Sequence, residues 1–575
     1  MHTNDNIDIG TLESFFKERF SEQSGDKLDP IFSEKVNEKM TAYKVFEQDT
    51  LLLSEDKVKK CIKRLKSGRA AGHDCILPEH LKNALHTSVP AIIHNMLIIC
   101  GMFGVIPASF QLGILSPILK KPTLDPTAAK NYRPIIVSTT MSKLLEYIIL
   151  DSVSHHPFHK SQYGFIHQRS TNMAISLAND VIKYTTSRGS SVFACTLDAE
   201  MAFDGIPHSV LLYKAIDIIP DPWWRILFCW YNNLTVKIKW NKTMSNCFKI
   251  CKGTRQGGLT SPFLFNLFYQ DLVNNLTNMN GGIRINDCAY NVIAYADDLL
   301  LMSLTATGLQ RLIDSASDYI NNHGLRFNSD KTFCITFGKQ YLVPSPKWFL
   351  QNDHLRSTDS IEYLGAALSN STACHKNKRI KSCRNGFYKL QCAGLHRNGV
   401  KPNIVSYLWK AVLQPILVYA NGCQPLRLHE ILEMDKLQSK LVKCSLGLSK
   451  FLRSTPLMNA MNIHSILRIN EHNSMKLLKS ILCGSSSCKD FYFYIWRSQC
   501  RNNNYNTLFD RNIKYCDKYD ISLVKYLLDD AYAKRCCKIF KPVIINNGLV
   551  DSLRHLLKDF SENDQCLTKL LLSPF

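Results

Sequence analysis

Acidic residues are scarce in this chain. Its 575 residues include 70 Lys and Arg against 48 Asp and Glu, which gives a formal net charge of +22 and a pI near 9.2. The 67-residue stretch from Tyr363 to His429 has no Asp or Glu but ten Lys and Arg, eight of them between Lys376 and Lys401. Because a solvated helix usually mixes both signs, this imbalance favours a nucleic-acid partner over an acidic small molecule.

Signals for secretion, for crossing a membrane and for binding structural zinc are also missing. The first eight residues do not begin a signal peptide, so we expect an intracellular protein, in the nucleus or the cytoplasm, that is not secreted. The longest apolar stretch, 89–107, is interrupted by His94 and Asn95 and is short for a membrane span; it predicts a buried helix and no membrane partner. The 21 cysteines are scattered, with spacings that match neither a zinc knuckle nor a zinc ribbon.

The most informative feature that is present is a pair of adjacent acids, Asp297 and Asp298. Apolar runs at 291–294 and 299–302 flank the Tyr-Ala-Asp-Asp segment, which predicts strand, tight turn and strand with both acids at the tip. Taken alone, two acids in a turn are more often a solvated turn than a catalytic pair. In a buried setting they are tolerable only with a bound cation or a hydrogen-bond network.

A third carboxylate, Asp198, ends the apolar run 192–197, which predicts a buried central strand. If this strand lies beside the hairpin, Asp198 and Asp297 can hold two Mg²⁺ ions roughly 3.5–4 Å apart, with Asp298 as a further candidate ligand and Mn²⁺ as the alternative ion. One ion would activate a 3′-hydroxyl and the other would hold a triphosphate. Phe203 would lie under the incoming sugar and exclude a 2′-hydroxyl, although a core aromatic is the simpler interpretation of a single phenylalanine.

Eight segments in a definite order resemble the reverse transcriptase of LINE-type (non-LTR) retrotransposons. The resemblance runs from about Val58 to about Ile466. The segments are 65–74, 115–121 with 131–135, 161–165 with 169–171, 198–204, 254–262, 295–298, 324–332 and 363–365. Each segment alone has weak to moderate specificity, whereas the ordered set is very specific.

The resemblance implies an α+β, right-hand polymerase with fingers, a palm on an antiparallel ferredoxin-like sheet, and a helical thumb, flanked by mostly helical extensions. The expected divisions are an N-terminal extension (1–50), fingers (51–160), a palm with the catalytic segments and primer grip (161–370), a basic thumb (371–485) and a C-terminal extension without an assigned role (486–575). The implied partners are an RNA template, a DNA primer and dNTPs.

The candidate site residues fall into four groups. Asp198, Asp297 and Asp298 are the candidate catalytic metal ligands, and the resemblance makes Lys331 a candidate proton donor near the pyrophosphate. The candidate nucleotide-binding residues are Lys120, Lys121, Arg133, Phe203, Arg255, Gln256 and Gly257. The candidate primer grip is Tyr363, Leu364 and Gly365. Nucleic-acid contacts are expected at Arg169, Lys376, Lys378, Arg379, Lys381 and Arg384.

Simpler structural explanations also fit several of these residues. Lys120, Lys121 and Arg133 suit a triphosphate, but a solvated basic loop also explains them. The glycines of 253–258 allow a close backbone approach to a substrate, while Thr260 or Ser261 ahead of Pro262 are also plain helix-capping chemistry.

The sequence therefore predicts an RNA-directed DNA polymerase that uses two-metal nucleotidyl transfer to join a dNTP to a DNA 3′-hydroxyl on an RNA template. Met201 stands where the family usually carries Lys, and Gly258-Leu259 stand where Asp or Cys followed by Pro is common. We expect no endonuclease domain, so that nicking would come from a separate activity. The alternatives are an RNA-directed RNA polymerase, against which Phe203 argues, and a catalytically inactive relic or co-opted RNA-binding scaffold.

Overall fold

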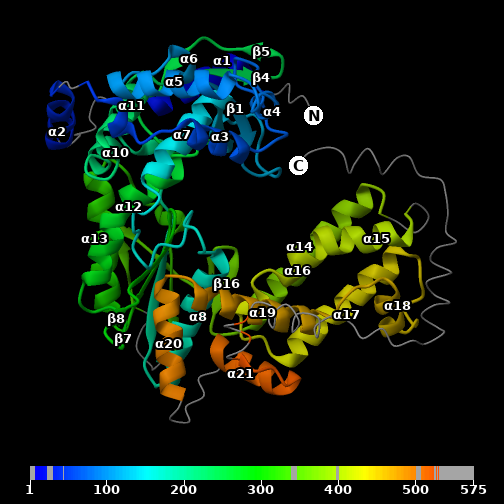
Figure 1. Cartoon of the computed structure of the whole chain (residues 1–575). Coiled ribbons are helices and arrows are strands. Elements are labelled where there is room, and N and C mark those ends of the chain that lie inside the picture. The colour runs from blue at the N-terminus through cyan, green and yellow to red at the C-terminus, as the bar shows by residue number, and fades with distance from the viewer. Residues whose placement is uncertain are drawn as a thin grey trace.

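The computed structural model describes residues 7–21, 30–42, 45–338, 346–395, 400–499 and 507–523, together with Tyr526 and Asp529. Figure 1 shows an upper lobe, a central domain built on a sheet, and a helical arm that extends to the right. The helices α20 (Ser487–Gln499) and α21 (Leu508–Tyr519) lie at the bottom of that view. The helical close expected from the sequence near 553–572 lies outside the described residues.

The upper lobe contains a small mixed sheet. Strand β1 (Leu112–Leu119) pairs with β2 (Tyr132–Val137) in antiparallel fashion and with β4 (Thr235–Trp240) in parallel. The short strands β5 (Thr243–Met244) and β6 (Phe248–Lys249) pair with β4. The helices of the lobe are α2 (Pro30–Thr41), α3 (Glu55–Arg64), α4 (Pro78–Asn83), α5 (Val89–Phe103), α6 (Ala108–Gln111), α7 (Thr140–Ser152), α10 (His208–Lys214) and α11 (Asp221–Asn232). The lobe therefore combines two stretches of chain that lie far apart in the sequence.

The N-terminal helix α1 (Ile9–Phe20) packs into the core of this lobe. Its side chains Leu12, Phe16 and Phe20 recur every four residues and are buried on one face. The Asp8 carboxylate caps the helix by accepting a hydrogen bond from the Thr11 amide at 2.8 Å. At the other end, the Phe20 carbonyl accepts from the Cys251 amide. Residues 9–20 therefore contribute side chains to the core of this lobe.

The central domain holds a sheet with the strand order β9-β10-β3-β11-β14. The strands are β3 (Val192–Leu197), β9 (Val292–Tyr295), β10 (Asp298–Ser303), β11 (Phe333–Phe337) and β14 (Arg356–Ser357), and the short hairpins β7 (Arg284–Ile285) with β8 (Cys288–Ala289) and β12 (Phe349–Leu350) with β13 (Asp353–His354) lie outside it. Along the chain, β3, α12 (Ser261–Asn278), β9, β10, α13 (Ala306–Asn322) and β11 follow one another, which is the β-α-β-β-α-β order of a ferredoxin-like motif. The four strands of this motif pair in antiparallel fashion, as the sequence predicted.

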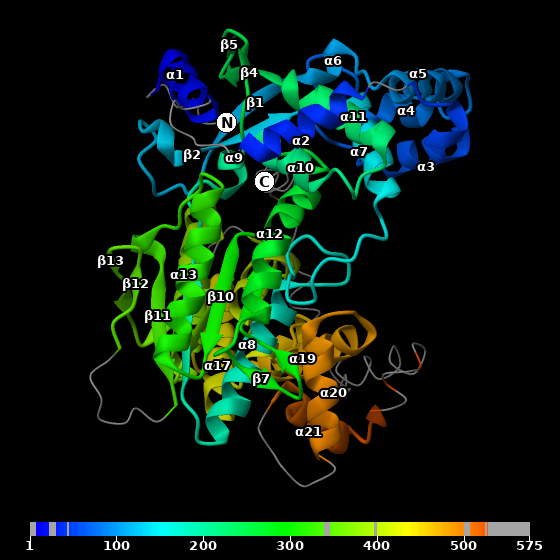
Figure 2. The same cartoon turned by 90° about the vertical axis from the view of Figure 1, so that its left-hand side faces the viewer.

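Both faces of the central sheet are covered. On β10, Leu299 and Leu301 belong to the core that includes α12 and α13, whereas Leu300 and Met302 belong to the core that includes α8 (Thr171–Ser187), α19 (Ile466–Cys483) and α20. Figure 2 shows α12 and α13 running alongside β10. Burial on both faces explains why the strand sequence is apolar without interruption.

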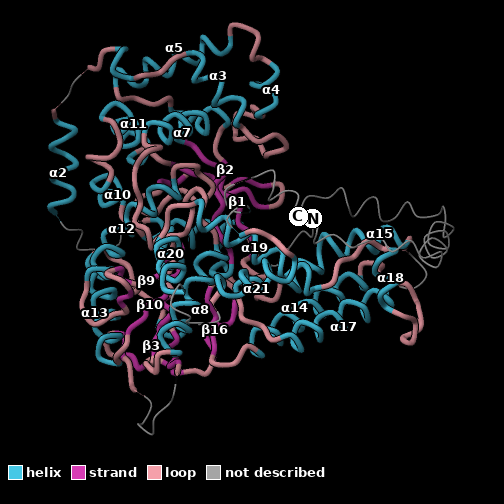
Figure 3. The backbone as a smooth tube through the Cα atoms, turned by 60° about the horizontal axis from the view of Figure 1, so that its bottom comes forward, coloured by secondary structure: helices cyan, strands magenta, loops and turns pink. Residues whose placement is uncertain are grey.

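The helical arm has its own hydrophobic core. Its helices are α14 (Ala373–Cys392), α15 (Pro402–Leu408), α16 (Gln414–Val418), α17 (Leu428–Ser445) and α18 (Ser454–Ala460). Figure 3 shows α14 and α17 side by side along the arm. A hairpin of β15 (Ser360–Tyr363) and β16 (Ala366–Ser369) precedes α14 and joins the arm to the central domain. Among the described helices, none is long and apolar enough to cross a membrane.

Candidate active site

The turn between β9 and β10 carries the adjacent acids. Tyr295 and Asp298 face each other across the two strands, so Ala296 and Asp297 form a two-residue turn. Ala296 adopts a left-handed conformation with φ of +55°, which turns the chain within two residues. The expected strand, tight turn and strand are therefore observed, with one acid in the turn and one at the first position of β10.

A buried segment supports this turn from below. The side-chain oxygen of Gln162 accepts hydrogen bonds from the amides of Ala296, at 3.1 Å, and Gly164, at 3.0 Å. The Tyr163 amide donates to the Ala294 carbonyl at 2.7 Å. A Cβ atom at Gly164 would lie 2.4 Å from the Ala296 nitrogen, so this approach requires glycine. The segment 161–165 thus fixes the position of Asp297.

The third acid lies at the same end of the sheet. Leu197 of β3 pairs with Leu299 of β10, so Asp198 follows β3 directly beside the start of β10. The Asp198 carbonyl accepts from the Asn328 amide at 2.9 Å. The Lys331 ammonium lies 2.9 Å from an Asp198 carboxylate oxygen, and both side chains keep solvent access, at 66% and 32% exposure. The structure therefore brings Asp198, Asp298 and Lys331 together at the turn.

The acids at this end are held in mutual repulsion. Burial raises the pKa of Asp298 to about 7, and the charges of Asp297, Asp198 and Glu362 add to the rise while Lys331 opposes it. Burial and, to a smaller extent, the Asp198 charge also raise the pKa of Asp297, whereas a main-chain hydrogen bond and, more weakly, the charges of Arg133 and Lys331 lower it. The end of the sheet thus carries more negative than positive charge.

The donor chemistry fits hard divalent cations. All three candidate ligands are aspartates on strand ends or in a rigid turn, and their repulsion is what a bound cation would relieve. Within the described residues, no group of three or more His, Cys, Asp or Glu side chains is arranged to hold a metal ion. Mg²⁺ is usually held by one or two carboxylates together with water and substrate phosphates.

Basic side chains lie along the neighbouring edge of the upper lobe. The Lys120 ammonium donates to the Lys130 carbonyl at 2.7 Å, and Lys120, Lys121 and Arg133 are all exposed. Burial lowers the pKa of Lys120, and the charges of Arg19, Lys331 and Arg133 contribute to the same shift. The charge of Arg133 also lowers the pKa of Asp297.

Phe203 is held by other aromatic rings. Its ring stacks on Phe265 of α12 with centroids 4.0 Å apart and planes at 14°. The exposed ring of Phe165 meets it edge-on at 6.0 Å. The position of Phe203 is therefore fixed by packing, and the side chain remains half-buried rather than enclosed.

In the loop 253–258, each of the three residues predicted to contact the nucleotide also contacts another part of the protein. Arg255 forms a buried ion pair with Glu146 at 2.6 Å. The side-chain amide of Gln256 donates to the Asp204 carboxylate at 2.6 Å. Gly257, with φ of +109°, approaches the β2 backbone, where a Cβ atom would lie 2.5 Å from the Ile136 carbonyl oxygen. The glycine therefore serves contact with β2, and the nucleotide role of all three residues stays a prediction.

Asp204 is a second buried charge beside this loop. The carboxylate pairs with the guanidinium of Arg19 from α1 and accepts from Gln256. Burial raises the pKa of Asp204, and the charge of Arg19 is the largest opposing influence. Sequence reasoning missed Arg19 and Glu146, because no local pattern connects either residue with its distant partner.

The turn of the β15–β16 hairpin is held from two sides. The buried Tyr363 hydroxyl donates to the Ile293 carbonyl of β9 at 3.0 Å. Leu364 and Gly365 both have positive φ, 50° and 78°, as in a type I′ turn. From the arm, Tyr419 donates to the Leu364 carbonyl at 2.8 Å and Arg379 donates to the Gly365 carbonyl at 3.1 Å. The predicted primer-grip segment therefore links the central sheet to the arm.

The cations expected to bind nucleic acid differ in their surroundings. Lys376 pairs with Glu433 at 2.5 Å and Lys378 pairs with Glu362 at 2.6 Å, while Arg379 is buried beside Tyr419. Lys381 and Arg384 are exposed on α14. Away from the arm, Arg169 donates to three main-chain carbonyls, those of His159, Gln162 and Ser485.

Comparisons with known proteins agree with the ordered segments. Residues 118–368 match the family described as reverse transcriptase (RNA-dependent DNA polymerase). The chain is 24% identical over 386 residues to the RNA-directed DNA polymerase from mobile element jockey of Drosophila funebris, which covers 64% of this chain and 40% of that protein. It is 23% identical over 446 residues to the probable RNA-directed DNA polymerase from transposon X-element of Drosophila melanogaster, which covers 72% and 46%. Similarity to the Pol polyprotein from type-2 retrotransposable element R2DM of Drosophila melanogaster is 25% over 316 residues, which covers 52% and 29%.

The chain spans less than half the length of each of these three relatives. Among solved structures, apo telomerase from Candida tropicalis, truncated from its C-terminal domain, aligns with a TM-score of 0.31 and 12% identity over 46% of this chain and 54% of that chain. The matched family region, 118–368, includes the three acids, Lys331 and the β15–β16 hairpin. Residues 118–368 therefore match a reverse transcriptase domain, and the chain is similar to the polymerases of the non-LTR retrotransposons jockey, X-element and R2.

Proposed function

We propose that this chain is an RNA-directed DNA polymerase of a non-LTR retrotransposon that joins dNTPs to a DNA 3′-hydroxyl on an RNA template. The observation that carries the proposal is the set of three carboxylates at one end of the central sheet, where Lys331 pairs with Asp198. Its nucleic-acid substrates place its site of action inside the cell, in the nucleus or the cytoplasm.

In this proposal the chain is a right-hand polymerase. The central domain is the palm, the upper lobe provides the fingers, and the arm is the thumb. The pairing of β4 with β1 supports adding residues 235–249 to the fingers, although they follow the first palm strand in sequence. The close packing of α1 supports counting residues 9–20 with the fingers as well.

Asp198, Asp297 and Asp298 are the proposed ligands of two Mg²⁺ ions. When bound, these ions supply Lewis-acid stabilisation of the triphosphate and favour ionisation of the 3′-hydroxyl. The protein's own contribution is a rigid turn, held by Gln162, that keeps Asp297 in place without reorganisation. Lys331, bonded to Asp198, is proposed to donate a proton to the leaving pyrophosphate.

The residues around the acids are proposed to bind the other parts of the substrate. Lys120, Lys121 and Arg133 offer fixed positive charge to the triphosphate. The stacked ring of Phe203 is proposed to exclude a ribose 2′-hydroxyl, supported by its fixed position against Phe265. Tyr363, Leu364 and Gly365 are proposed as the primer grip, and Lys381 and Arg384 as duplex contacts of the thumb.

Primer extension on an RNA template with Mg²⁺ and dNTPs tests the proposal. Wild-type protein should extend a labelled DNA primer, and Asp297→Asn should lower the rate by about 10³-fold or more, since it removes a charged ligand at the reaction centre. Asp318→Asn, which neutralises an exposed acid on α13, is the matched control and should extend normally.

Two outcomes would redirect the assignment. If well-folded wild type binds a template–primer duplex but extends no primer, the inactive relic or RNA-binding scaffold becomes the better explanation. If wild type incorporates rNTPs in preference to dNTPs, the chain is an RNA-directed RNA polymerase and Phe203 does not exclude a 2′-hydroxyl.

A further inference from the structure

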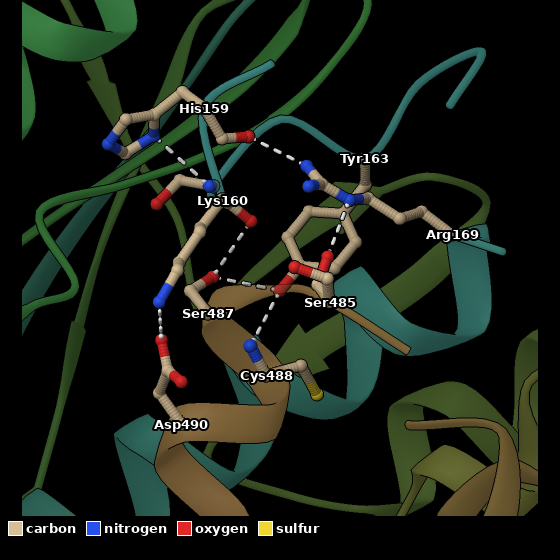
Figure 4. A network of polar contacts seen from close by, with 9 residues as sticks. His159, Lys160, Tyr163, Arg169, Ser485, Ser487, Cys488 and Asp490 are labelled. Atoms are coloured by element: carbon tan, nitrogen blue, oxygen red, sulfur yellow. Dashed lines mark hydrogen bonds and ion pairs between the residues drawn. The ribbon is translucent and has the colours of Figure 1, made fainter. Parts of the chain in front are cut away.

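The start of helix α20 meets the loop that follows α7 in a polar network (Figure 4). The buried Tyr163 hydroxyl accepts from the Cys488 amide at 3.0 Å and shares a hydrogen bond with the Ser487 hydroxyl at 2.9 Å. The Ser487 amide donates to the Lys160 carbonyl at 3.2 Å. The Lys160 ammonium pairs with Asp490 at 2.9 Å. The C-terminal segment is therefore fastened to residues 160–163 by side chains and by main chain.

The same short loop supports the acidic turn on its other side. Gln162 accepts from the Ala296 amide, and the Tyr163 amide donates to the Ala294 carbonyl. Tyr163 thus contacts α20 through its hydroxyl and β9 through its main chain. Two successive residues, Gln162 and Tyr163, therefore connect the C-terminal helix to the turn that carries Asp297.

Arg169 closes the network. Its guanidinium donates to the carbonyls of His159, at 2.6 Å, and Gln162, at 2.5 Å, and also to the Ser485 carbonyl, at 3.0 Å. Figure 4 shows this side chain directed into the network from the α8 side of the loop. The planar donor set of arginine suits three carbonyls in this way, which the single ammonium of lysine does not reproduce.

We infer that the segment 485–490 is a positioning element for the acidic turn, and that Tyr163, Arg169 and Ser487 are positioning residues. Arg169 acts through Gln162, and Ser487 acts through Tyr163, whose amide donates to the Ala294 carbonyl. The inference rests on the proposed function and assigns a role to the C-terminal helices, for which the sequence offered none. It also gives Arg169 a role different from the nucleic-acid contact predicted from the sequence. Because a displacement of a reacting group by a fraction of an ångström is enough to slow chemistry strongly, loosening this support lowers turnover while leaving duplex binding intact.

Two variants of the full chain test the inference. Ser487→Ala removes the hydroxyl bonded to Tyr163 without touching the acids. Arg169→Lys keeps the positive charge but loses the three-carbonyl geometry. The matched controls are Ser465→Ala, which removes another serine at a helix start, and Arg64→Lys, which changes an arginine paired with Asp151 in the upper lobe.

Three readouts are compared on an RNA–DNA template–primer duplex. The positioning role predicts that kcat falls about tenfold in both variants while the Kd for the duplex and its salt dependence stay unchanged. Hydrogen–deuterium exchange should show faster exchange of the Ala294 and Ala296 amides in both variants, and in neither control. This second readout does not depend on activity.

The outcomes separate this inference from the proposed function. If wild type does not polymerise, the proposed function fails, and amide exchange alone decides whether the C-terminal segment supports the turn. Unchanged amide exchange and unchanged kcat in Ser487→Ala and Arg169→Lys would overturn the inference. An Arg169 variant with a weaker Kd and normal kcat would overturn its positioning role in favour of the direct nucleic-acid contact.

Discussion

Charged side chains around this site are compensated in two different ways. In the loop region, Arg255 is matched by Glu146, and Asp204 is matched by Arg19. At the end of the central sheet, Asp198, Asp297 and Asp298 lie near the charges of Lys331 and Arg133. The first region has a countercharge for each charge, whereas the second has an excess of negative charge.

The difference supports the proposal that the acids at the sheet end have a use beyond folding. A matched buried pair loses its water but regains hydrogen bonds, so it is a tolerable part of a folded core. An excess of partly buried carboxylate is unfavourable for folding and is often found where the charge has another use. The excess at the sheet end therefore marks the site more clearly than any single residue does.

Breaking a matched pair should have the largest effect on stability. Arg255→Met leaves Glu146 buried without its countercharge and should lower the free energy of unfolding by about 3–5 kcal/mol, measured by urea denaturation. The double variant Arg255→Met/Glu146→Leu should recover most of that loss. A single variant as stable as wild type would mean that the two regions do not differ in the way described.

Removing the fixed aromatic ring should have the next largest effect. Phe203→Ala should lower the preference for dNTP over rNTP by about 10–100-fold, because the space for a 2′-hydroxyl opens. The preference is measured as the ratio of kcat/KM values in single-nucleotide incorporation. Phe193→Ala, a partly buried aromatic of β3 packed near Trp348, is the control and should keep the preference. An unchanged ratio in Phe203→Ala would contradict the proposal that this ring excludes a 2′-hydroxyl.

Relieving the unmatched region should stabilise the protein, in contrast to the matched one. The folded state raises the pKa of Asp298 to about 7, so the protonated form is favoured on folding, and that stability is lost as the pH rises from about 4 to about 7. Asp298→Asn keeps the side chain neutral and should gain about 1–2 kcal/mol over wild type at pH 8 in the absence of divalent metal, after allowance for solvent screening. The gain should vanish near pH 4, whereas Asp318→Asn should show no such pH dependence in urea denaturation.

Neutralising exposed cations of the arm should have the smallest effect. Lys381→Gln/Arg384→Gln should weaken duplex binding and make the slope of log K against log salt shallower by about 2, one for each lost phosphate contact. Lys59→Gln, on the upper lobe, is the control. An unchanged slope would remove α14 from the duplex path. Arg379 is unsuitable for this test because it supports the β15–β16 turn.

Local patterns were sufficient to predict the sheet end. The antiparallel order of the central strands was implied by the family resemblance. The acidic turn and the strand before Asp198, in contrast, follow from apolar runs and turn residues. These features depend on residues close together in the chain, where hydrophobic periodicity is informative.

Long-range partners could not be predicted in the same way. Nothing near Arg255 indicates that Glu146 lies beside it, and nothing near Gly257 indicates that it faces the Ile136 carbonyl. An arginine at position 169 is compatible with a nucleic-acid contact, since a guanidinium binds phosphates as readily as carbonyls. In the structure, the Arg169 guanidinium donates its hydrogen bonds to main-chain carbonyls. Pairing of β4 with β1 likewise has no local signature.

The most direct test of the central claim is the thermal stability of wild type and Asp297→Asn during titration with Mg²⁺, and in parallel with Mn²⁺. If the unmatched carboxylates bind divalent cations, the metal should raise the Tm of wild type and of Asp318→Asn, since binding to the folded state alone stabilises it. The rise should be absent in Asp297→Asn. An equal rise in all three proteins, or none in wild type, would contradict the assignment of this sheet end as the metal site.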